Sequence, residues 1–259
     1  KLIAQNEIGQ VDFKQIFSYL IMQSICGIIA YLITSKYFKR SIPESIIWAL
    51  TVALSNHVTL LLPITEIYFQ QNVITQVASI ILMDGVILLS VIAFFLELST
   101  KKNLDLFSFI KNLFLNPFIL SIIIGLLFLL LNFNIDQTPI EYTLSKLAAC
   151  VSPVGLFAIG IILSFYTKNV INKLSVSISV LKLLISPIIL LLIGLVFFNA
   201  GLPAEIPGAF FVSVAPCGVT SIVLCAAYNV SPENIIKAIF VSTFASIGTI
   251  FFAIKYLTL

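Results

Sequence analysis

The chain has few charged residues and few of the patterns on which soluble enzymes depend. Only 10% of its 259 residues are charged, whereas 60% are hydrophobic; a soluble domain carries roughly a quarter charged residues. It has one histidine, and its four cysteines fall inside apolar segments without metal-ligand spacing. Phosphate-binding loops, dinucleotide-binding glycine patterns and nucleophile elbows are missing. A soluble enzyme and an ATP-driven pump are therefore excluded, and neither a cofactor nor a metal is expected.

Long apolar segments recur along the chain instead. A helix needs about 20 mainly apolar residues to cross a bilayer. The pattern predicts an all-α polytopic membrane protein with eight spans, near residues 11–35, 44–70, 74–98, 113–133, 143–166, 171–198, 205–229 and 233–257. The lipid bilayer is therefore expected to surround most of the chain.

Basic residues cluster in the links after the first, third and fifth spans, while the links near 71–73, 132–141 and 199–204 have none. Cationic loops stay on the cytoplasmic side of a membrane. This alternation predicts a multi-pass protein of the plasma membrane, in particular a prokaryotic inner membrane, with its C-terminus outside. Because the net charge of +3 lies mostly at helix ends, it gives no indication of a nucleic-acid partner.

Two expected spans are interrupted by polar residues and a proline, over residues 55–63 and 213–221. Proline lacks an N–H and clashes with the carbonyl four residues earlier, so Pro63 would free the Thr59 carbonyl, and Pro216 would free that of Val212. Freed carbonyls are tolerated at membrane depth only where protein or a wet cavity satisfies them. Paired breaks in two halves of a membrane protein indicate a transporter's binding site.

The two halves also resemble each other. A shift of 160 positions aligns 11–93 with 171–253 and matches Pro43 to Pro203. The shift covers five spans, an odd number, so the copies would face opposite ways, as in the inverted repeats of secondary transporters.

This register has two consequences. Pro63 falls opposite Val223 rather than Pro216, so the breaks are expected to be offset by seven residues. The spans 113–133 and 143–166 have no counterparts before the first copy. Two helices, about fifty residues, are therefore expected to be missing from a ten-span protein, with an ordinary eight-helix protein as the alternative.

Motifs in both broken segments are similar to those of a known family. Asn56 and Pro63 match an Asn-x-Gly-x-x-Gly-x-Pro stretch, and Pro216 with Ser221 matches a Met-Pro-x-x-x-Asn-Ser stretch. Together with Asn116-Pro117 and the 153–160 segment, they make the chain resemble the auxin efflux carrier family along essentially its whole length. That family includes plant auxin exporters and bacterial malate or malonate permeases. Val58 and Leu61 replace its two glycines, and Thr220 stands where asparagine is usual.

The resemblance implies an architecture with a scaffold and a moving transport domain, in which the broken helices cross at mid-membrane. The first repeat of this chain would comprise the end of a truncated scaffold helix (1–10) and part of the transport domain (11–98, with crossing helix 44–70). Its second would comprise scaffold helices (113–166) and the rest of the transport domain (171–259, with crossing helix 205–229). Relatives suggest a homodimer formed through the scaffold.

The two breaks predict an anion site. Helix N-termini there would carry partial positive charge and free N–H donors, which suit a carboxylate. The candidate substrate-binding residues line the two breaks and are Asn56, His57, Thr59, Pro63, Pro216, Cys217, Gly218, Thr220 and Ser221. The expected function is that of a secondary carrier, not an enzyme, moving a small organic anion such as a dicarboxylate by alternating access.

Three ionisable residues inside the spans are candidates for ion coupling. His57 has an unperturbed pKa of about 6.5 and can change charge at physiological pH, or it can be a neutral packing residue. Asp84 is costly at mid-span unless it is functional or paired, for example with Lys182. Lys182 could instead snorkel or attract anions. Two rival functions stay open: a sodium- or proton-coupled carrier of the bile acid symporter or exchanger type, and a membrane sensor without transport.

Overall fold

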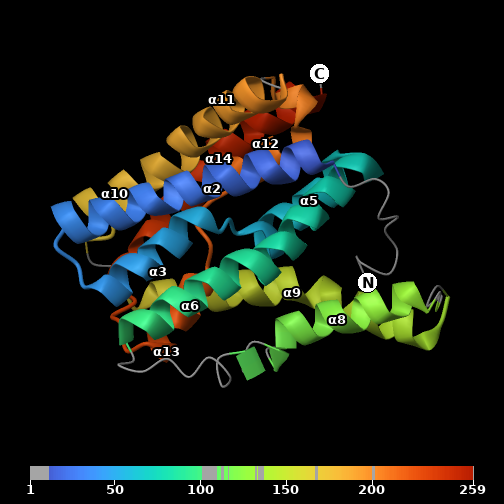
Figure 1. Ribbon diagram of the computed structural model, residues 1–259, viewed down its shortest axis with the longest axis horizontal. Helices are drawn as coiled ribbons and strands as arrows, with labels where there is room; N and C mark the ends of the chain where they lie inside the picture. The colour runs from blue at the N-terminus through green and yellow to red at the C-terminus, as the bar shows by residue number, and fades with distance from the viewer. Residues whose placement is uncertain are drawn as a thin grey trace.

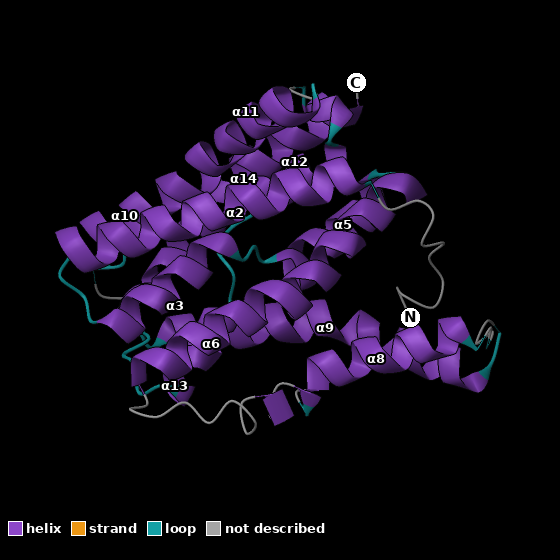
Figure 2. Ribbon diagram, viewed as in Figure 1, coloured by secondary structure: helices purple, strands orange, loops and turns teal. Residues whose placement is uncertain are grey.

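The computed structural model of the chain describes residues 12–100, 110–111, 114–115, 117–131, 133, 137–166, 169–199 and 202–258. Over these residues the structure is helical and has no strand, only an isolated bridge between Ser55 and Cys217. Figure 2 shows helices joined by short loops. The prediction of an all-α protein is confirmed, while the expected scaffold-helix end at 1–10 and Asn116 lie outside the described residues.

Five helices in the described part of the chain are long and apolar enough to cross a membrane. The first is α2 (Phe13–Leu32) with the π-helical turn Ile33–Tyr37, and the second joins α5 (Gln71–Met83) to α6 (Leu89–Thr100) through the π-helical turn Asp84–Leu88. The others are α9 (Pro139–Ser164), α10 (Lys173–Val180) continued by the π-helical turn Leu181–Ile185 and α11 (Ser186–Phe198), and α14 (Glu233–Thr258). A shorter apolar helix, α8 (Pro117–Leu130), precedes α9.

The two interrupted spans are broken helices. The first consists of α3 (Ile42–Ala53), then the π-helical turn His57–Leu61 that continues into α4 (Leu62–Tyr68). The second begins with the 3-10 turn Pro203–Glu205 and consists of α12 (Pro207–Ser213) and α13 (Thr220–Ala227). Each break therefore lies in the interior of an apolar segment.

The breaks are in register, and the expected offset of seven residues is wrong. The first helical half ends at Ala53 and the second at Ser213, so both end at positions equivalent under the 160-residue shift. Pro63 does not make its break, because it lies within the helical segment that has already resumed at His57. The chain leaves α3 earlier, at Leu54, whose backbone is extended.

The helices pack around these breaks. In Figure 1, α2 runs beside α11, while α8 and α9 lie along the opposite edge of the molecule. Contacts join α2 to α3 and α11, α10 to α14, and α9 to the turn at 57–61. The largest buried side chains include Trp48, Tyr19 and Phe211. Large apolar side chains such as Phe251 and Phe252 of α14 face outward, as expected of a helix surrounded by lipid.

Candidate functional site

The two breaks are joined to each other through the backbone. The Asn56 N–H donates to the Pro216 carbonyl at 2.9 Å, and the Gly218 N–H donates to the Thr51 carbonyl at 3.2 Å. Gly218 is required at this crossing, because a Cβ there would lie 2.8 Å from the Leu54 carbonyl oxygen. The segments 54–56 and 214–219 thus form one crossing built from both halves of the chain.

Serine hydroxyls satisfy both carbonyls that the prolines were expected to free. Ser152 of α9 donates to the Thr59 carbonyl at 2.5 Å, and Ser55 donates to the Val212 carbonyl at 2.9 Å. Each serine comes from a different element than the carbonyl it serves. The breaks are therefore stabilised by tertiary hydrogen bonds, as backbone groups at membrane depth require.

A buried lysine lies behind the crossing. Lys182, in the π-helical turn between α10 and α11, has no exposed surface, and its Nζ donates to Ser55 Oγ at 2.8 Å. The Tyr19 hydroxyl lies 3.3 Å from the same oxygen. Through Ser55, Lys182 is linked to the Val212 carbonyl, near the C-terminal end of α12. A cation is favoured there because the C-terminal end of a helix carries partial negative charge.

Asp84 is paired with His57 rather than with Lys182. Asp84 Oδ2 lies 3.0 Å from His57 Nε2; Asp84 is fully buried and His57 is 6% exposed. The second nitrogen of His57, Nδ1, and the second oxygen of Asp84, Oδ1, are buried without a hydrogen-bond partner. Asp84 and Lys182 both lie in π-helical turns, which occur frequently at functional sites.

Helix α9 covers the crossing on the side of Asn56. The Thr59 hydroxyl donates to Asn56 Oδ1, and a Cβ placed on Gly155 would lie 2.8 Å from the Thr59 methyl group. Ser152 and Gly155 were not among the residues expected from the sequence. The signal that could have found them is a pair of small residues on one helix face, which allows close helix packing in membranes.

The structure brings most of the sequence-predicted substrate residues together, and several of their hydrogen-bond donors are already bonded to other groups of the protein. The Cys217 N–H donates to Ser242 Oγ at 3.2 Å, and the Ser221 hydroxyl donates to the Gly218 carbonyl at 2.8 Å. Thr220 begins α13, while Pro63 lies beyond the crossing in α4. Asn56, His57 and the start of α13 are therefore the parts of this set that could still meet a ligand.

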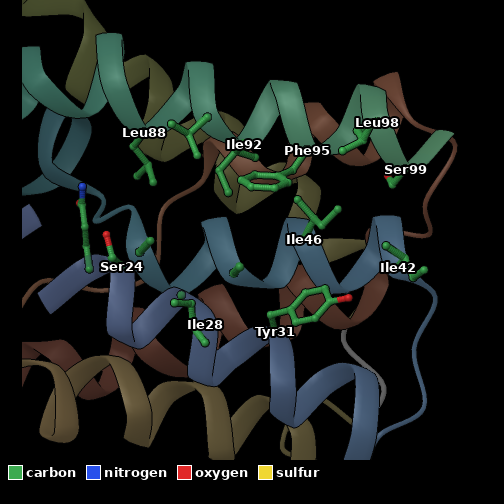
Figure 3. Close-up of a pocket in the computed structure, with 15 residues that line it drawn as sticks. Ser24, Ile28, Tyr31, Ile42, Ile46, Leu88, Ile92, Phe95, Leu98 and Ser99 are labelled. Atoms are coloured by element: carbon green, nitrogen blue, oxygen red, sulfur yellow. The ribbon is translucent and has the colours of Figure 1, made fainter. Parts of the chain in front are cut away.

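A cavity of about 630 Å³ lies between α2, α3 and α6. Figure 3 shows Leu88 and Ser24 at one end, with Leu98 and Ser99 toward the other. Ala53, the last residue of α3, also lines the cavity, which therefore ends beside the residue that precedes the first break. None of its lining residues is charged. Its size is that of a small-molecule site.

A family model described as "Membrane transport protein" matches residues 3–254. The chain belongs to this family, the auxin efflux carriers. No curated protein matches the chain. Members of this family are membrane transport proteins, and the family is not an enzyme family. The apolar helices of this chain agree with a multi-pass membrane protein.

Proposed function

We propose that this chain is a secondary carrier that moves a small organic anion, such as a dicarboxylate, across the plasma membrane by alternating access. The observation that carries the proposal is the crossing, where the backbone N–H of Asn56 in one broken helix donates to the Pro216 carbonyl in the other at 2.9 Å. Broken helices that meet inside a membrane protein form substrate sites in many secondary transporters.

The chemistry of the crossing suits a carboxylate. One helical segment begins there at His57 and another at Thr220, and the first N–H groups of a helix lack partners within it. Because Cys217 and Gly218 already donate their N–H groups within the protein, the carboxylate is expected at the start of α13 and at the Asn56 amide.

An inverted repeat is part of the proposal and is supported by two contacts. Ser186 Oγ lies 3.3 Å from Cys26 Sγ, and these residues are 160 positions apart. Asn56 and Pro216, which are in contact, have the same separation. Equivalent residues can touch each other only near a two-fold axis that relates two copies, and this axis would pass through the crossing.

Alternating access then follows from the division into two parts. We assign α8 and α9 to a scaffold, which could also form a homodimer, and the remaining described helices to a transport domain. The two parts meet where Ser152 and Gly155 contact Thr59. Sliding of the transport domain along α9 would expose the crossing to alternate sides, with the C-terminus outside.

An ion-coupled carrier is the second candidate, favoured by the buried His57–Asp84 pair. An acidic group within a membrane segment is expensive and marks ion or proton pathways in transporters. Asp84 retains an oxygen without a partner. Substrate uptake into proteoliposomes, measured with and without a sodium or proton gradient, distinguishes this candidate from an uncoupled facilitator.

Uptake of labelled malate, malonate and an indole carboxylate into proteoliposomes tests the main proposal. We expect at least one acid to move, and Asn56→Ala to weaken its binding by about tenfold or more, because a hydrogen bond to a charged group contributes about 1.5–3 kcal/mol. Asn72→Ala is the matched control, since Asn72 is exposed and bonds the adjacent Val73 N–H. The proposal fails if none of the acids binds or moves.

A further inference from the structure

The buried ionisable groups at the crossing form a small set whose charges can be counted. Among the described residues, Tyr19 of α2 and Lys182 interact electrostatically with Asp84, and Cys26 of α2 and Cys217 at the second break interact in turn with Lys182. Tyrosine and cysteine are ordinarily uncharged at neutral pH. The charge of the site is therefore decided by Asp84, Lys182 and His57.

Buried charges must balance, because an uncompensated ion in a low-dielectric interior is costly. The negative charge of Asp84 and the positive charge of Lys182 cancel, so the site is neutral when His57 is neutral. One substrate carboxylate at the crossing adds one negative charge; a diacid such as malate or malonate carries a second carboxylate, which must lie outside this buried set for the count to hold. A proton on His57 restores neutrality.

The geometry identifies the atom that takes this proton. With Asp84 ionised, His57 Nε2 carries the hydrogen that faces Asp84 Oδ2 at 3.0 Å. The other nitrogen, Nδ1, is then a bare lone pair, buried and without a partner. A lone pair repels a carboxylate, whereas a protonated Nδ1 donates to it. Protonation therefore converts the site from repelling an anion to binding one.

A metal cation fits this place less well than a proton does. Hard cations such as Ca²⁺ take about six to eight oxygen ligands, and Asp84 has one oxygen, Oδ1, that is not already engaged. A positive charge on Lys182, whose Nζ donates to Ser55 at the crossing, would repel a cation. The surroundings of Asp84 thus favour proton exchange on His57 and disfavour a bound sodium ion.

We propose that His57 takes up one proton at Nδ1 for each substrate anion bound at the crossing, that Asp84 positions the imidazole, and that Lys182 is a fixed positive charge. The proton enters from the water on the side where substrate binds and leaves with the substrate on the other side. This inference rests on the proposed function and names the coupling ion and its number. The carrier is therefore a proton–anion symporter.

Proton uptake on binding can be measured directly in weakly buffered detergent solution with a pH-indicator dye. Malate, malonate or an indole carboxylate is the added probe. We expect about one proton bound per anion and, because the proton and the anion bind together, an affinity that falls as the pH rises, by up to about tenfold per pH unit. His57→Gln should abolish both effects, and Asp84→Asn should diminish them. Asp12→Asn is the matched control, because Asp12 lies at the start of α2, where its carboxylate accepts from the Lys14 N–H and from Gln15 Nε2.

The outcomes separate this inference from the proposed function. Binding of an acid with no proton uptake by the unmodified chain overturns the inference and leaves an anion carrier. Binding that requires sodium also overturns it and favours a cation-coupled carrier. If no acid binds or moves, the proposed function fails and the inference fails with it. The unmodified chain decides each case, so a variant that does not fold does not affect the test.

Discussion

Replacing Gly155 by alanine tests whether α9 packs directly against the crossing. The added Cβ would lie 2.8 Å from the Thr59 methyl group and 3.5 Å from Thr59 Cβ. The first separation is too short for two carbon atoms, so α9 or Thr59 must shift. Overpacking of this kind costs about 1–3 kcal/mol, although alanine is otherwise favoured over glycine in a helix by about 1 kcal/mol.

Gly160→Ala provides the matched control, because Gly160 is in the same helix and nothing lies within 4 Å of a Cβ placed there. We expect Gly160→Ala to leave stability unchanged or slightly raised. Gly155→Ala should lower the thermal unfolding midpoint in detergent relative to this control. It should also weaken substrate binding, since displacement of Thr59 disturbs its hydrogen bond to Asn56.

A second substitution isolates the contact. Thr59→Ser removes the methyl group but keeps the hydroxyl that bonds Asn56. Combined with Gly155→Ala, it should restore most of the lost stability, with a coupling energy of about 1 kcal/mol or more in a double-mutant cycle. If the two effects simply add, or if the Gly155 and Gly160 variants behave alike, the packing of α9 on the crossing is refuted.

Two further substitutions test the buried polar contacts. Ser152→Ala should destabilise the protein by about 1–3 kcal/mol, because it leaves the half-buried Thr59 carbonyl without the Ser152 hydroxyl. Ser164→Ala, in the same helix but bonded only within it, should have little effect, and equal unfolding midpoints would contradict the assignment. Lys182→Met should cost about 3–5 kcal/mol, because the charge of Asp84 is left uncompensated. A loss no larger than that of the exposed Lys173→Met would argue against this charge balance.

Composition and hydropathy were sufficient to predict the helical class, and polar residues within the apolar segments identified the two spans that are interrupted. Apolar segments of sufficient length have few alternatives to helices in a bilayer. The partners of Asp84 and Lys182 could not be predicted, because they depend on how helices far apart in sequence are placed. His57 and Asp84 are 27 positions apart, and Lys182 meets Ser55 across 127 positions. Apolar patterning shows which face of a helix is buried, but it does not show what the polar side chains on that face will meet.

The proline positions were misleading for a specific reason. Within the crossing, Asn56 donates its N–H to the Pro216 carbonyl. In two identical halves, residue 216 would return an N–H to the Asn56 carbonyl, but proline has no N–H to give. The Asn56 carbonyl instead accepts from the Leu61 N–H at 3.3 Å, and this bond closes the π-helical turn at 57–61. Pro216 thus shapes both breaks, whereas Pro63 only follows one of them. The same asymmetry puts Asn56 and His57 at the start of the helical segment that follows the first break. A ligand at the crossing would therefore meet side-chain donors from the first half of the chain and backbone donors from the second.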